Sequence, residues 1–221
     1  QVLAKAVKKI YPNSKLAIGP TIENGFYYDI FFEKPISEED LPKIEKEMKK
    51  IIALGSEIKK THRSKKDAID LFQKRNEDYK VNIIKDANQE NNFSVYCQEN
   101  SDFIDLCKGP HLPNLKLIGS FKLTKISGAY WKGDSKNEML QRIYGTAWKN
   151  QKDLEEYLNM LEEAERRDHR LLGKKMDLFH FQEEAPGAVF WHPKGWTLFQ
   201  QLISYMRKKQ DQAGYLEINT P

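Results

Sequence analysis

Cysteine is scarce in this sequence. Only Cys97 and Cys107 occur among 221 residues, too few for the disulfide framework of a small secreted domain. No apolar run approaches the roughly 18 residues that a membrane span needs, and we find no signal peptide. We therefore expect a globular cytoplasmic protein that has no contact with membranes.

Several common catalytic motifs are also missing. The chain has no Gly-x-Gly-x-x-Gly, no Gly-x-x-x-x-Gly-Lys-Ser/Thr and no Gly-x-Ser-x-Gly. These absences argue against a dinucleotide fold, a P-loop and a serine-hydrolase elbow. The histidines outside the motif discussed below show neither His-x-x-x-His nor Cys-x-x-Cys spacing; they are His62, His169, His180 and His192.

The composition allows a real core beneath a very polar surface. Hydrophobic residues make up 39% and charged residues 31% of the chain, and the net charge is +4. The length predicts one domain of about 150 residues plus something more. Basic residues gather at 59–66 and 166–175, where they would attract a polyanion such as a nucleic acid. Such runs are also typical of solvated helix faces.

The first 148 residues predict a mainly antiparallel α+β domain. Helical spacing indicates a helix at 2–10 that is expected to begin before residue 1, and two more helices capped by Ser37 and Ser64. Strand-like segments follow one another directly, which favours antiparallel pairing. The predicted strands are 15–18, 25–32, 79–84, 94–98, 103–107, 121–126, 128–131 and 139–144.

The rest of the chain changes in character. Residues 151–172 repeat apolar positions with helical period and predict one long connecting helix. After Gly173 come an aromatic segment rich in proline and glycine, a helix at 197–212 and a closing strand-like stretch at 215–221. About 45 residues with one helix and one strand cannot bury a core, so we expect this part to be cut from a longer domain.

The most informative stretch is Asp-Leu-Cys-Lys-Gly-Pro-His at 105–111. If 103–107 is a strand, Asp105 and Cys107 share one face, and Gly109-Pro110 turns the chain so that His111 returns towards Cys107. A carboxylate, a thiol and an imidazole so placed can hold a metal, a water or a substrate amine. A buried thiol and a hydrogen-bonded imidazole would look the same, and zinc would need further ligands.

At this stretch the chain resembles bacterial threonyl-tRNA synthetase, and the similarity extends over its whole length. The matching segments include Ala17-Ile18-Gly19-Pro20, Asn24-Gly25-Phe26-Tyr27-Tyr28-Asp29, Gly128-Ala129-Tyr130-Trp131, Met139 to Trp148 and Gln182 to Gly187. The alanyl-tRNA synthetase editing domain shares the Cys-x-x-x-His pattern but not the segment after residue 173.

The resemblance implies three parts. Residues 1–148 would be the editing domain, which hydrolyses serine wrongly attached to threonine tRNA, and 149–173 would be a linker helix. Residues 174–221 would begin the class II aminoacylation domain, with motif 1 ending at Pro221. The full enzyme would use ATP, magnesium and a catalytic-domain zinc, and would be a homodimer, whereas this segment alone would not aminoacylate.

Carried over by position, the resemblance also implies the site residues. Lys80 would position or polarise water, Asp105 would bind the substrate amino group, and Cys107 and His111 would shape the pocket, with zinc at these two residues as a further possibility. Tyr28 and Tyr96 would line it. Gln1 stands where the second histidine of a family His-x-x-x-His pair is expected. Two other interpretations remain: a tRNA-binding module that does not edit, and a zinc-dependent hydrolase unrelated to tRNA.

Overall fold

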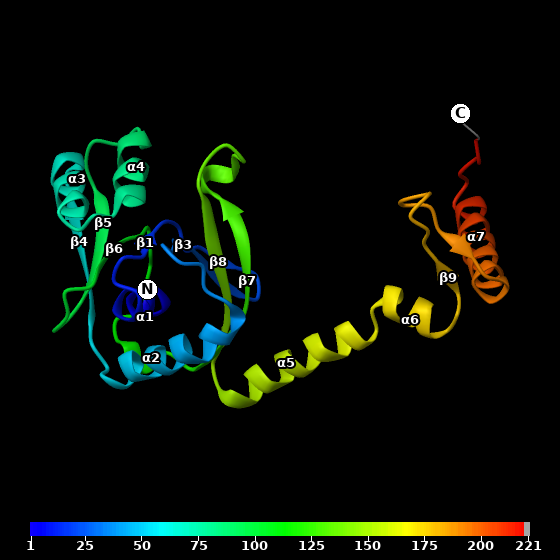
Figure 1. Ribbon diagram of the computed structural model, residues 1–221, viewed down its shortest axis with the longest axis horizontal. Coiled ribbons are helices and arrows are strands. Elements are labelled where there is room, and N and C mark those ends of the chain that lie inside the picture. The colour runs from blue at the N-terminus through cyan, green and yellow to red at the C-terminus, as the bar shows by residue number, and fades with distance from the viewer. Residues whose placement is uncertain (219–221) are drawn as a thin grey trace. The chain divides into compact units, whose positions relative to one another are not determined.

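The computed structural model describes residues 1–218, arranged in two compact units (Figure 1). The first unit is Gln1–Glu155 and the second begins at Glu156. Of the predicted closing strand, residues 215–218 form no strand and 219–221 lie outside the described residues. Among residues 1–218 no helix has the length and apolar character needed to cross a bilayer.

The larger sheet of the first unit is antiparallel throughout. Its strands run in the order β1-β3-β8-β7, with β2 paired to β3. Their bounds are β1 Lys15–Leu16, β2 Thr21–Ile22, β3 Gly25–Phe31, β7 Ser120–Tyr130 and β8 Met139–Trp148. The two strands predicted at 121–126 and 128–131 are one, because β7 stays paired with β8 along its length apart from an irregularity between Leu123 and Lys125.

Two helices complete the main core against this sheet. They are α1 (Val2–Ile10) and α2 (Leu41–Ala53), the latter preceded by the 3₁₀ turn η1 (Glu38–Asp40). The backbone N–H of Ser37 donates to the Asp40 carboxylate at 2.9 Å, as in a capping box. Buried side chains of α1 and α2 meet those of β3, so α1 is held firmly beside the sheet. The 3₁₀ turns η2 (Leu115–Leu117) and η3 (Trp131–Gly133) lie in the connections before and after β7.

A second, smaller sheet carries the motif. It has the antiparallel order β4-β5-β6, with bounds β4 Ile58–Arg63, β5 Phe93–Gln98 and β6 Ile104–Leu106. The helices α3 (Lys65–Gln73) and α4 (Asp78–Asp86) pack with β5 around a separate core. The α+β class with antiparallel sheets is therefore confirmed.

The strand predicted at 79–84 is wrong, because this segment forms the middle of α4. Val81 and Ile84, three residues apart, both enter the core shared with α3, a spacing that suits a helix rather than a strand. The Tyr79 side chain projects from another face of the same helix and contacts the Trp131 ring, with ring centroids 4.9 Å apart. Tertiary packing thus decides the conformation of a short apolar run that is ambiguous by itself.

The helix predicted at 151–172 is interrupted. It consists of α5 (Gln151–Arg166), which continues from the first unit into the second, and α6 (His169–Lys175). Asp168 starts α6 by accepting a hydrogen bond from the Arg170 backbone N–H at 2.7 Å. The second unit also contains β9 (Phe179–His180), β10 (Phe190–Trp191) and α7 (Pro193–Gln212), and α7 begins four residues before the predicted start.

Candidate functional site

Asp105 occupies the middle of β6 and is almost completely buried, with 3% of its surface exposed. The predicted alternation is confirmed: Ile104 and Leu106 pack against the core of α3 and α4. Asp105 points to the opposite face, where its cross-strand partner on β5 is Tyr96. A carboxylate in such a place needs strong partners, because transferring a charge out of water is costly.

Two of the predicted residues supply these partners. The Lys80 Nζ atom of α4 lies 2.7 Å from Asp105 Oδ1, and the Tyr28 hydroxyl of β3 donates to Asp105 Oδ2 at 2.9 Å. Lys80 Nζ also donates to the Tyr28 hydroxyl at 2.9 Å. The structure thus brings Lys80, Tyr28 and Asp105 into one closed triangle, built from a helix, the large sheet and the small sheet.

The Tyr28 ring is tightly fixed. Burial, followed by the nearby Asp105 charge, raises the pKa of Tyr28 well above its usual value, so the hydroxyl keeps the proton that it donates. A Cβ atom on Gly19 would approach the Tyr28 ring to 2.2 Å. Only glycine therefore fits at position 19, which gives a physical reason for the Ile-Gly-Pro motif.

Tyr96 and His111 form a second contact pair beside the triangle. Their rings meet edge to face with centroids 4.5 Å apart. Gly109 lies between Tyr96 and His111 in the sequence, in the turn that follows β6. Its φ is +70°, and a Cβ atom there would lie 1.8 Å from the Tyr96 hydroxyl. The turn after β6 therefore requires glycine, and it delivers His111 to the Tyr96 ring.

The His111 imidazole is held in its neutral form. Burial lowers the pKa of His111 below its usual value, against the opposing effect of the nearby Asp105 carboxylate. Gln1 also lies within electrostatic range of Asp105, Cys107 and Lys80. Gln1, the N-cap residue of α1, is therefore part of the same site.

Cys107 directly follows β6, and its backbone N–H donates to the Ser94 carbonyl at 3.2 Å. Its thiol is free and partly exposed. Within residues 1–218 no three His, Cys, Asp or Glu side chains gather to hold a metal ion. Cys107 and His111 alone supply two ligands, fewer than a zinc site requires.

Unpartnered polar atoms mark this region most clearly. Among the described residues, the buried side-chain nitrogen and oxygen atoms without a hydrogen-bond partner are Gln1 Nε2 and Oε1, Gln98 Nε2, Asp105 Oδ1 and His111 Nε2. Asp105 Oδ1 does have its ion pair with Lys80. Each unpaired buried group costs about 1–3 kcal/mol, and native proteins keep few of them. Their concentration here is typical of a site built to bind a polar ligand.

Sequence reasoning missed Gln98 and Lys5. The Lys5 Nζ atom of α1 donates to Gln98 Oε1 of β5 at 2.8 Å. Alternation along β5 could have found Gln98, because it lies two residues after Tyr96 and therefore on the same face. The contact with Lys5 joins residues 93 positions apart, which no local pattern predicts.

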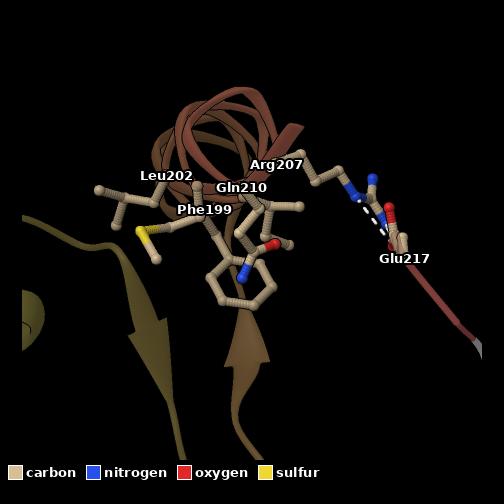
Figure 2. Close-up of a pocket in the computed structure, with 7 residues that line it drawn as sticks. Phe199, Leu202, Arg207, Gln210 and Glu217 are labelled. Atoms are coloured by element: carbon tan, nitrogen blue, oxygen red, sulfur yellow. Dashed lines mark hydrogen bonds and ion pairs between the residues drawn. The ribbon is translucent and has the colours of Figure 1, made fainter. Parts of the chain in front are cut away.

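Other side-chain groupings differ from this site. In the second unit His180 Nδ1 and His192 Nε2 are 2.7 Å apart, and their other ring nitrogens pair with Gln182 and Asp177. A surface pocket of about 400 Å³ lies on α7 and is shown in Figure 2. Its polar lining includes the Arg207–Glu217 ion pair, with Nη2 and Oε1 2.7 Å apart. Neither place holds unpartnered buried polar atoms.

Two comparisons with known proteins bear on this geometry. The family model described as "Threonyl and Alanyl tRNA synthetase second additional domain" matches residues 93–144, which contain Tyr96, Asp105, Cys107 and His111. Over 220 residues, 100% of this chain, the sequence is 53% identical to threonine–tRNA ligase of Marinobacter nauticus. The chain spans 34% of the length of that relative. The resemblance that the motifs indicate is therefore confirmed.

Proposed function

We propose that this chain contains a site that hydrolyses serine from mischarged threonine tRNA. The proposal starts from the match of the whole chain to part of a bacterial threonyl-tRNA synthetase. The observation that carries this proposal is the buried Lys80–Asp105–Tyr28 triangle, surrounded by polar atoms without partners. Such a site suits a small polar ligand carrying an ammonium group and an ester. The matching family model over residues 93–144 supports the same assignment.

The need for such a site follows from the chemistry of recognition. Serine is threonine without one methyl group, and a missing methyl provides only about 1–3 kcal/mol of discrimination in a binding pocket. A second pocket that accepts serine and excludes the extra methyl supplies the remaining accuracy. Close packing by Tyr28, Tyr96 and His111 would provide this steric limit.

The proposed reaction is direct attack of water on the ester. Asp105 binds the ammonium group of the seryl residue, and Lys80 orients the water and polarises it. The water oxygen bonds to the ester carbonyl carbon, and the bond from that carbon to the ribose oxygen breaks. Serine leaves as the free acid and the ribose hydroxyl receives a proton. Cys107 and His111 shape the pocket and hold water, without a covalent intermediate.

The wider assignment is part of the same proposal. Residues 1–148 are the editing domain, 149–173 the linker, which comprises α5 and most of α6, and 174–221 the start of the class II aminoacylation domain. The whole protein would charge threonine tRNA in the cytoplasm as a homodimer, with ATP, magnesium and a zinc in its catalytic domain.

The test is release of serine from mischarged threonine tRNA by the full-length protein that contains this chain. We expect serine release, and a clear loss on Cys107→Ala, because the thiol helps to shape the pocket. Absence of release by the unchanged protein would overturn the editing assignment.

A second candidate is a tRNA-binding module that does not edit. It is favoured by one observation: a glutamine, Gln1, lies beside Asp105 where the family resemblance leads us to expect a histidine. This function predicts salt-sensitive tRNA binding without any serine release. Replacing Gln1 with histidine in the full-length protein would then produce hydrolysis where the unchanged protein has none.

A further inference from the structure

Gln98 lies on the face of the small sheet that carries the proposed editing site. On β5 it follows Tyr96 by two residues, so both side chains project from one face of the small sheet, the face that also carries Asp105. Gln98 is only 1% exposed. A neutral polar side chain in this position must meet other polar groups, or it destabilises the fold.

Lys5 fixes the orientation of the Gln98 amide. An ammonium group can only donate hydrogen bonds, so the amide oxygen Oε1 must face Lys5 Nζ at 2.8 Å. The amide nitrogen Nε2 then points away from Lys5, and it is buried without a partner. Gln98 therefore presents a fixed hydrogen-bond donor.

Helix α1 connects this donor to the rest of the site. Gln1 and Lys5 are four residues apart, so their side chains lie on one stripe of the helix. Gln1 is beside Asp105, and Lys5 contacts Gln98 one step further along the same sheet face. Burial lowers the pKa of Lys5, which agrees with its place beneath the sheet rather than in open solvent.

We propose that Gln98 is a substrate-binding residue, which donates a hydrogen bond from Nε2 to an acceptor oxygen of the seryl-tRNA. This inference rests on the proposed function. Lys5 is its positioning residue. A carbonyl, a serine hydroxyl and a phosphate all offer such an oxygen. The donor would thus complete recognition of a ligand whose ammonium group is bound by Asp105.

The test uses the full-length protein and compares serine release by variants of Gln98 and of Lys5. Gln98→Glu keeps an acceptor for Lys5 but removes the donor, and Gln98→Met removes both. We expect each to raise KM about tenfold with a smaller change in kcat, as for one lost hydrogen bond to a buried group. Lys5→Met should have a similar effect, whereas Lys5→Arg, the matched control, should keep activity.

Substrate variants identify the oxygen. An effect of Gln98→Glu on seryl-tRNA that is absent for alanyl-tRNA assigns the hydroxyl, and an equal loss in binding of uncharged tRNA assigns a phosphate. An equal loss with seryl-tRNA and alanyl-tRNA, without a loss in binding of uncharged tRNA, assigns the carbonyl. Unchanged KM in folded Gln98→Glu and Gln98→Met, with active unchanged protein, would overturn this inference while leaving the proposed hydrolysis intact.

Discussion

The first unit contains two buried aspartates that each face a cationic side chain. The two carboxylates differ in how completely their oxygens are hydrogen-bonded. Asp29 of β3 pairs with Arg142, its neighbour on β8, through two hydrogen bonds of 2.7 and 2.9 Å. Asp105 of β6 pairs with Lys80, which reaches it from a different element, and one of its oxygens has an ion pair but no aligned hydrogen bond. In the first pair both carboxylate oxygens are hydrogen-bonded across the strands. In the second pair Asp105 Oδ1 can still accept a hydrogen bond from a ligand.

Their surroundings differ in the same sense. The Arg142 guanidinium is 3.9 Å from the centre of the Tyr27 ring and remains about a quarter exposed. Lys80 and Asp105 are each 4% exposed at the side chain, and Asp105 lies within electrostatic range of Gln1 and His111, which both carry unpaired side-chain atoms. Neighbouring residues of β3, Tyr28 and Asp29, thus contribute to opposite faces and to opposite kinds of site. The comparison teaches that unsatisfied polar atoms, rather than charge burial alone, separate a binding site from a structural ion pair.

The largest expected effect on stability comes from Lys80→Met. This change leaves the Asp105 carboxylate buried and unpaired, which should lower the free energy of unfolding by about 3–5 kcal/mol. Arg142→Met should cost only about 1–2 kcal/mol, between the values for surface and buried pairs, because water reaches that site. Urea unfolding of the two variants measures the difference. Equal losses would remove the contrast between the two pairs.

Tyr28→Phe should have an intermediate effect. It removes the hydroxyl that donates to Asp105 and accepts from Lys80, so we expect a loss of about 1–3 kcal/mol in the free energy of unfolding. Tyr27→Phe is the matched control on the next residue of β3, where the ring contact with Arg142 would remain. Thermal unfolding of both proteins tests this, and similar melting temperatures would contradict the role given to the Tyr28 hydroxyl.

The smallest effect concerns pH and His111. Burial lowers the pKa of His111 in the folded protein below the value of about 6.5 for an unfolded chain. The folded state then binds fewer protons than the unfolded state below pH 6.5, so stability is complete above that pH and falls as the pH drops towards the folded pKa. His111→Gln should weaken this acid dependence. Unfolding measured between pH 5 and 8 should show a shallower pH slope for the variant, and identical slopes would contradict the assignment.

Part of the site follows from local patterns alone. The alternation in residues 103–107 predicts the face of Asp105, because apolar neighbours at 104 and 106 need a core on the other side. Gly109 is predictable as a turn, and the structure adds that the Tyr96 hydroxyl leaves no room for a side chain. Such features depend on residues a few positions apart.

The rest depends on contacts between distant segments. Lys80 was predicted on a strand and lies on α4, because packing against α3 decides the fold of a short apolar run. Tyr28 meets Asp105 across 77 positions and Lys5 meets Gln98 across 93, and neither contact has a local signature. Only the family resemblance predicted that Lys80 and Tyr28 share a site with Asp105.

The most direct measurement is the rate of serine release from mischarged threonine tRNA by Asp105→Asn and Asp29→Asn in the full-length protein. We expect Asp105→Asn to slow release by about 100-fold or more, since it removes the carboxylate that pairs with the buried ammonium group. Folded Asp29→Asn should release serine at nearly the rate of the unchanged protein. Equal rates for the two variants would contradict the claim that the incomplete aspartate pair is the hydrolytic site.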